Sequence, residues 1–85
     1  MYEILVLEDA ESDLKSLDRL VARRIVRRVE WLAENLDDIK PEQLTGKLSG
    51  FFKLRVGNYR VIYRVIKSES LIVIHRVGHR REVYR

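Results

Sequence analysis

The chain has 85 residues, of which 46% are hydrophobic, and it carries a formal net charge of +4. It contains no cysteine, which excludes disulfides and thiolate metal sites. No apolar run approaches the roughly 18 residues of a membrane-spanning helix, and the N-terminus lacks a signal-peptide pattern. We therefore expect a single cytoplasmic domain, residues 1–85, with no membrane contact.

The charge is distributed unevenly along the chain. Residues 1–42 contain seven Lys or Arg and eleven Asp or Glu, whereas residues 43–85 contain ten Lys or Arg and two Asp or Glu. Twelve of the 17 basic residues are arginines, whose planar guanidinium group suits the binding of phosphate. The C-terminal half is therefore the part that we expect to meet a polyanion.

The first half of the chain predicts one strand and two helices. Residues 2–7 (YEILVL) are rich enough in apolar residues for a strand. Apolar residues then recur every three or four positions between residues 10 and 37, which predicts amphipathic helix. Asp9 is the expected N-cap of the first helix. One long helix is compatible with this spacing, but we favour a break near residues 16–18, because Asp18 could cap a second helix.

The second half predicts three strands. A proline ends the helical region, and a connector with two glycines follows. Residues 52–56 alternate apolar and basic side chains, Gly57-Asn58 fits a two-residue hairpin turn of the primed type, and residues 59–66 form the next strand. A polar turn leads to the last long strand, residues 71–77. This order predicts an α+β fold, in which an N-terminal strand and a two-helix hairpin accompany a mostly antiparallel four-stranded sheet.

Alternation along these strands predicts a basic sheet surface. Tyr59, Val61, Tyr63 and Val65 share one side of their strand, which we assign to the core. The opposite side of the sheet collects Lys53, Arg55, Arg60 and Arg64, and it could include Arg76. Like charges this close together repel one another, so a polyanionic ligand would relieve the cost of gathering them.

Residues 53–63 (KLRVGNYRVIY) and 77–84 (VGHRREVY) carry the most specific signal in the chain. Together they resemble the RelE branch of the RelE/ParE toxin superfamily, and the predicted order of elements is also similar. The resemblance implies the toxin of a type II toxin–antitoxin pair, which would enter the ribosomal A site and cleave mRNA there. It also implies a RelB-like antitoxin as partner, in addition to the ribosome and mRNA.

The resemblance implies a role for each matching residue. Lys53 matches a basic residue that helps to deprotonate the attacking 2′-hydroxyl, and Arg60 matches an arginine that holds the scissile phosphate. Arg80 matches an arginine that stabilises the transition state and assists the leaving group. Tyr84 matches a C-terminal tyrosine that stacks on a base. Further contacts with RNA are expected from Arg55, Arg64, Arg76 and Arg81.

The chain departs from the best-known family pattern at two positions. Phe51 stands where a second lysine is expected, and His79 stands where the better-known relative has lysine. Because an imidazole can hold or release a proton near neutral pH, we expect His79 to share or take over acid–base work beside Arg80. His75, on a strand face with apolar neighbours, is expected to be structural. No metal or other cofactor is expected, because no Asp, Glu or His cluster has ligand spacing.

Two other functions are compatible with the sequence. A ParE-like inhibitor of DNA gyrase would share the fold without nuclease chemistry. A non-catalytic module that binds RNA or an antitoxin would keep the basic surface without needing Tyr84. The resemblance implies that gyrase inhibitors of this fold lack the full nuclease set, so the combination of Arg60, Arg80 and Tyr84 favours the ribonuclease. Pre-placed guanidinium groups would stabilise the extra charge of a pentacovalent phosphorane.

Overall fold

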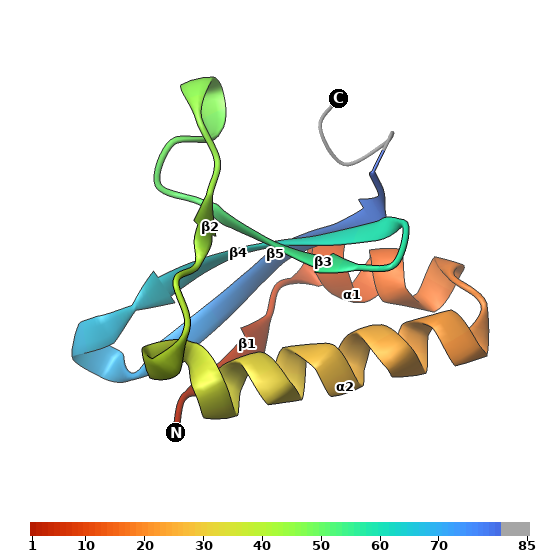
Figure 1. Cartoon of the computed structure of the whole chain (residues 1–85). Coiled ribbons are helices and arrows are strands. Elements are labelled where there is room, and N and C mark those ends of the chain that lie inside the picture. The colour runs from red at the N-terminus through yellow and green to blue at the C-terminus, as the bar shows by residue number, and fades with distance from the viewer. Residues whose placement is uncertain (81–85) are drawn as a thin grey trace.

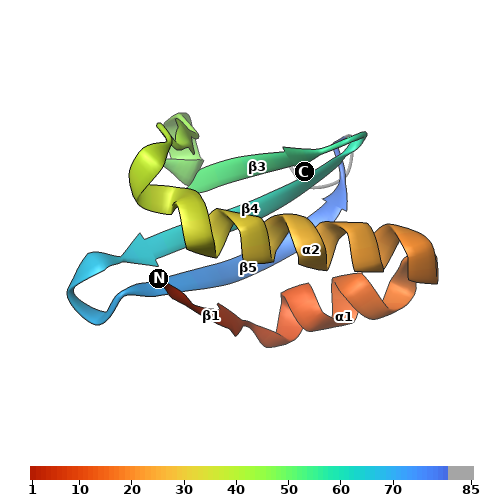
Figure 2. The same ribbon diagram turned by 60° about the horizontal axis from the view of Figure 1, so that its bottom comes forward.

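In the computed structural model, which describes residues 1–80, two α-helices cover one face of a five-stranded sheet (Figure 1). The elements are β1 (Glu3–Val6), α1 (Glu8–Ser16), α2 (Arg19–Asn35), β2 (Glu42–Gln43), β3 (Phe52–Val56), β4 (Tyr59–Ile66) and β5 (Leu71–His79). Figure 2 shows α2 crossing in front of β4 and β5. Neither helix in this part of the chain is long and apolar enough to cross a membrane.

The strand order in the sheet is β1-β5-β4-β3-β2. β1 runs parallel to β5, whereas the other neighbouring pairs are antiparallel. The predicted α+β fold, with its N-terminal strand, two-helix hairpin and mostly antiparallel sheet, is confirmed. The sheet has five strands instead of the expected four, because Glu42 and Gln43 pair with β3. A two-residue strand is too short to show any periodicity in the sequence.

The helical region is divided where the sequence indicated. α1 ends at Ser16, and α2 begins at Arg19. The Asp18 side chain caps α2 by accepting a hydrogen bond from the Leu20 N–H at 3.1 Å. Its capping role and the break between the two helices are therefore confirmed.

The start of α1 differs from the expectation that Asp9 is its N-cap. The N-cap is Leu7, and Asp9 lies in the first turn of the helix. The Leu7 N–H donates a hydrogen bond to the Ile74 carbonyl at 3.0 Å, so the chain stays extended against β5 up to this residue. The helix starts directly afterwards, and Asp9 lies where the helix dipole favours a carboxylate.

The main core lies between α2 and the helix-facing side of the sheet. Val61 and Tyr63 are 0% and 1% exposed, and Tyr59 and Val65 pack against the same cluster. The predicted core side of β4 is therefore confirmed. Burial raises the pKa of Tyr63 to about 12, because the charged phenolate is disfavoured away from water. The helices add Ala10, Ile25, Val29, Leu32 and Ala33 to this cluster.

A β-bulge interrupts the alternation of β5. Ile62 pairs with Arg76, but Tyr63 pairs with Ile74, so His75 is an extra residue between two matched pairs. Ile74 and Val77 are both in the core cluster, although they are three residues apart. The bulge therefore turns Arg76 to the side of the sheet that faces away from the helices, which strict alternation with Ile74 would not do.

The side of the sheet that carries Arg60, Ile62 and Arg64 is called the outer face here. In Figure 1 the two α-helices lie below the sheet, and the connector between β2 and β3 rises above it. Ile62 and Val73 are only 4% and 3% exposed, yet they do not belong to the main core cluster. Both side chains are therefore buried on the outer face, apart from the main core.

Candidate functional site

Strand pairing gathers cations on the outer face in two neighbouring rows. One row crosses three strands through Arg55, Arg60 and Gly78. The next row runs through Lys53, Ile62 and Arg76. Directly opposite residues share one face of a sheet, with their Cβ atoms about 4.5–5.5 Å apart. The two rows therefore form one continuous basic surface.

Arg60 lies at the centre of this surface and is 7% exposed, which makes it the one buried charged side chain among residues 1–80. Its Nη1 donates to the Tyr59 carbonyl at 3.3 Å, and its Nε is buried without a hydrogen-bond partner among residues 1–80. A buried charge is costly unless it is paired and hydrogen-bonded. An anion bound next to this guanidinium would offset that cost.

Lys53 reaches the outer face from β3. Its Nζ lies 3.4 Å from Oε1 of Glu42, and the two side chains are 23% and 57% exposed. The pairing of β2 with β3 brings these residues opposite each other. A surface ion pair of this kind contributes only about 0–1 kcal/mol, so a phosphate could compete with Glu42 for Lys53.

Arg80 lies at the same end of the sheet as Arg60. Its backbone N–H donates to the Asn58 carbonyl at 3.0 Å, and this holds the residue after β5 against the β3–β4 turn. Gly57 opens that turn with a φ of +59°, as the predicted hairpin of the primed type requires. Arg80 is exposed to solvent. The predicted site residues Arg81 and Tyr84 lie outside the described residues.

His79 lies on the other side of the sheet from Arg60. It pairs with Tyr59 in the β4–β5 register, and the two rings meet edge to face with centroids 5.7 Å apart. Tyr59 packs against the main core, so the imidazole faces the helix layer. This placement lends no support to the expected acid–base role of His79 beside Arg80, which stays a hypothesis.

Arg64, which was expected to bind RNA, belongs to a cluster with His75 and Phe51. Its Nε donates to Nε2 of His75 at 3.0 Å, and its guanidinium carbon lies 5.7 Å from the centroid of the Phe51 ring. The rings of Phe51 and His75 meet edge to face at 4.8 Å. Burial, helped by the charge of Arg64, lowers the pKa of His75. The imidazole is therefore neutral at physiological pH, as an acceptor must be.

Arg76 joins β5 to α1. Its Nε and Nη2 donate to the two carboxylate oxygens of Asp13 at 2.8 and 3.1 Å, and the Val77 N–H donates to the same carboxylate at 2.9 Å. Burial alone would raise the pKa of Asp13, but these hydrogen bonds and the charge of Arg76 outweigh it and lower the pKa. The guanidinium of Arg76 is thus already engaged by a carboxylate, whereas no carboxylate among residues 1–80 pairs with Arg60.

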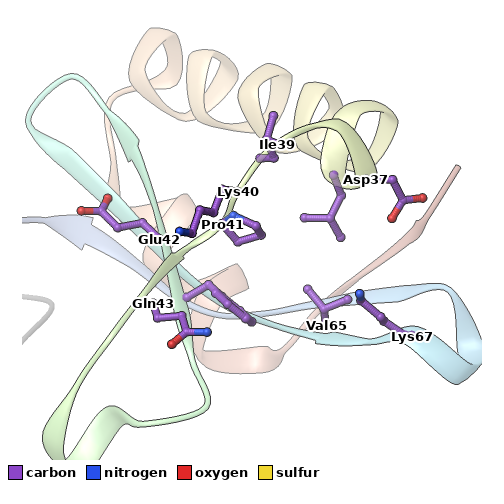
Figure 3. A pocket seen from close by; sticks show the side chains of 10 residues that line it. Asp37, Ile39, Lys40, Pro41, Glu42, Gln43, Val65 and Lys67 are labelled. Carbon is purple, nitrogen blue, oxygen red and sulfur yellow. The ribbon is translucent and has the colours of Figure 1, made fainter.

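A cavity of about 910 Å³ lies apart from the predicted site. It lies beyond the C-terminal end of α2, with Phe52 and Val65 from the helix-facing side of the sheet in its wall (Figure 3). Asp37, Lys40, Glu42 and Lys67 give it a mixed charge. None of the described residues that were predicted to bind or cleave RNA lines it.

Sequence reasoning missed two acidic residues that hold cations of the outer face. Glu42 contacts Lys53, and Asp13 contacts Arg76. The only signal in the sequence is the excess of acidic residues in the first half against basic residues in the second half. That excess indicates pairing between the halves, but it does not indicate which residues pair.

Comparisons with known proteins agree on the kind of protein. A family model described as the ParE toxin of the type II toxin–antitoxin system, parDE, matches residues 4–84. Toxin RelG of Mycobacterium tuberculosis is 43% identical over 86 residues, which cover 99% of this chain and 97% of RelG. A putative RelE-like toxin of Escherichia coli is 26% identical over 84 residues, which cover 93% of this chain and 83% of that protein.

Solved structures show the same fold. The toxin–antitoxin complex RelBE2 from Mycobacterium tuberculosis matches with a TM-score of 0.83 and 29% identity, over 93% of this chain and 98% of that chain. Isolated RelE of Escherichia coli matches with a TM-score of 0.78 and 24% identity, over 99% and 92%. A helix-backed sheet with an open basic face is thus the structure of a type II toxin. The chain belongs to the RelE/ParE toxin superfamily, as its C-terminal motifs indicated.

Proposed function

We propose that this toxin is a metal-independent endoribonuclease that cleaves mRNA in the ribosomal A site. The observation that carries the proposal is the buried Arg60 guanidinium, whose Nε has no hydrogen-bond partner among residues 1–80, on the basic side of the sheet that faces away from the main core. A site that holds a fixed cation in advance stabilises developing negative charge without further reorganisation. An RNA phosphodiester is the anion that matches the rest of this surface.

The reaction is a transesterification within the RNA. The 2′-oxygen attacks the adjacent phosphorus, the P–O5′ bond breaks, and the products are a 2′,3′-cyclic phosphate and a 5′-hydroxyl. The proton of the 2′-hydroxyl ends on the leaving 5′-oxygen. Holding the 2′-oxygen in line with phosphorus supplies a large share of the rate, as in other positioned reactions.

Each described residue of the site has one task in this reaction. Arg60 binds the non-bridging oxygens of the scissile phosphate and stabilises the phosphorane. Lys53 helps to deprotonate the 2′-hydroxyl, and Arg80 stabilises charge on the leaving oxygen. Arg55 binds a neighbouring phosphate. Tyr84, which lies outside the described residues, keeps its expected task of stacking on a base, which is worth about 1–3 kcal/mol. Two other cations that were expected to bind RNA have protein contacts: Arg64 with His75, and Arg76 with Asp13.

The test is in vitro translation followed by toe-printing of the message on the ribosome. Wild-type toxin should give cuts at codon boundaries, and Arg80→Ala should leave the message intact. Arg23→Ala is the matched control, because it also removes one arginine, here from the exposed surface of α2. This variant should cleave the message normally. Uncut message with the wild-type protein would overturn the proposal.

A gyrase-inhibiting function is the second candidate, because the matching family model is described as a ParE toxin. It predicts inhibition of DNA supercoiling by gyrase and no cleavage of the message. A non-catalytic binding module predicts neither effect. In each case we propose a RelB-like antitoxin as partner, since the similar structures include toxin–antitoxin complexes such as RelBE2.

A further inference from the structure

We propose that an aromatic pocket on the outer face, next to the phosphate site, binds one unstacked nucleobase of the RNA. The inference rests on the proposed function, because it assigns the base that belongs to the cleaved strand. The pocket has a volume of about 550 Å³ and is lined by Leu48, Phe51, Ile62, His75 and Arg76, together with the start of α1. This volume is within the usual range for small-molecule sites.

The floor of the pocket is apolar and already desolvated. Ile62 is 4% exposed on the outer face, and Leu48 comes from the connector above the sheet. Neither residue belongs to the main core cluster. An aromatic base would cover this floor without displacing any polar contact of the core.

The wall of the pocket offers aromatic edges and planes. The rings of Phe51 and His75 are perpendicular within 3°, at an interplanar angle of 87°, and the hydrogen bond from Arg64 to His75 fixes this arrangement. Two perpendicular rings can give a planar ligand one stacking and one edge contact. The neutral state of His75, which follows from its lowered pKa, avoids adding a second charge beside Arg64.

The charged side chains that line the pocket favour a neutral nucleobase over an anionic ligand. Glu8 and Asp9, in the first turn of α1, also line the pocket, and their carboxylates would repel a phosphate or an acidic peptide. Carboxylates accept hydrogen bonds from amino groups on base edges. A neutral ring with N–H donors at its edge therefore fits the pocket better than a second phosphate does.

The position relative to Arg60 also suits one nucleotide. Ile62 in the pocket floor is two residues along β4 from Arg60 and on the same face. Two residues of a strand span about 6–7 Å, so a base in the pocket and its own phosphate at Arg60 are separated by little more than a sugar. Phe51 stands where the family pattern has lysine, so this chain has an aromatic ring there instead of a cation.

The experiment is an NMR titration of the antitoxin-free toxin with three probes: guanosine, guanosine 3′-monophosphate and inorganic phosphate. Both guanosine compounds should shift the side-chain resonances of Phe51, Ile62 and His75. Inorganic phosphate should shift only resonances around Lys53 and Arg60. Phe51→Ala should weaken binding of guanosine 3′-monophosphate about 5- to 150-fold, the usual range for loss of one stacked base, and leave phosphate binding unchanged.

Two further variants serve as controls. Phe51→Tyr keeps the ring and should bind the nucleotide like wild type. Phe52→Leu removes the neighbouring ring, which stacks on Tyr63 on the opposite side of the sheet, and should not affect nucleotide binding.

Nucleoside shifts that avoid Phe51 and His75 would overturn the pocket while leaving the ribonuclease proposal intact. If the antitoxin shifts the resonances of Phe51 and His75 and guanosine does not, the pocket would instead be a docking site for the antitoxin. If guanosine binds at Phe51 and His75 but the toxin does not cleave ribosome-bound message, the base-binding proposal would stand and the ribonuclease proposal would fail.

Discussion

Arg60 on β4 lies directly opposite Gly78 on β5, two residues before Arg80. The glycine adds no side chain to this row, so β5 places no side chain directly opposite Arg60. Since the N–H of Arg80 is held by the carbonyl of Asn58, the two arginines belong to one corner of the molecule. This arrangement is compatible with both guanidinium groups reaching one phosphate.

Two substitutions of Arg60 distinguish the contribution of its charge to cleavage from that of its guanidinium geometry. We expect Arg60→Ala to lower the rate of message cleavage about 100- to 1,000-fold, the usual loss when one pre-placed group is removed from a transition state. Arg60→Lys keeps the charge but loses the two-pronged donor, and it should recover only part of the rate. The measurement is single-turnover cleavage on purified ribosomes, with circular dichroism as a check of folding. Normal cleavage by Arg60→Ala would remove this residue from the mechanism.

Asp13 should contribute to stability rather than to cleavage. Asp13→Asn weakens three hydrogen bonds, two from Arg76 and one from the Val77 N–H. We expect a loss of about 1–2 kcal/mol in the free energy of unfolding, reduced by the partial exposure of Arg76. Glu11→Gln breaks an exposed pair with Lys15 and should cost less than about 0.5 kcal/mol. Urea denaturation compares the two, and equal losses would contradict the assignment.

The same carboxylate should make stability depend on acid pH. The pKa of Asp13 is lowered in the folded protein, so the unfolded chain binds its proton more readily. The stabilisation is therefore complete above the unfolded pKa, about 3.9, and is lost as the pH falls through the lower folded value. The gap in unfolding free energy between wild type and Asp13→Asn should shrink below about pH 4. A gap that is constant from pH 7 to pH 3 would refute this.

The lowered pKa of His75 predicts a second dependence of stability on pH, at milder acidity than that of Asp13. Its pKa is lowered in the folded state by burial and by Arg64, so protonation favours unfolding. Stability should be complete above the unfolded pKa, about 6.5, and should decline as the pH falls from there through the lower folded value. An NMR titration of the imidazole gives the folded pKa directly. His75→Gln should abolish the decline in this window, and its persistence would assign the effect to another group.

His79→Ala decides between the acid–base hypothesis and the observed placement. The ring contacts Tyr59 on the helix-facing side, so we expect cleavage within a few-fold of wild type and an unchanged pH–rate profile. Thermal stability should fall slightly, because an aromatic contact is lost. A large drop in rate, or the loss of one limb of the profile, would restore His79 to the chemistry.

Much of the fold follows from local patterns in the sequence. The period of apolar residues in the helices, the Asp18 cap and the Gly57-Asn58 turn are each encoded within a few residues, and each agrees with the structure. The short strand Glu42–Gln43 and the capping of α1 by Leu7 depend on pairing with distant strands. No pattern within the sequence segment itself indicates such pairing.

The candidate site was predictable as a set of cations but not in its contacts. Alternation places Lys53, Arg55 and Arg60 on one face, and the register agrees. Alternation could not indicate that Arg60 is buried, nor that Asp13 engages Arg76, because both depend on how a helix and a strand pack together. The aromatic pocket beside them arises from Phe51 and His75, which lie in different elements.

The extra residue at His75 makes the length of β5 as important as its composition. Deleting that one codon would place Arg76 directly after Ile74 and turn the bulge into regular pairing, with Arg76 still on the outer face and Val77 still in the interior. His75 is therefore the residue of β5 whose deletion the register of the sheet should tolerate most easily, although the contacts of His75 with Arg64 and Phe51 would be lost.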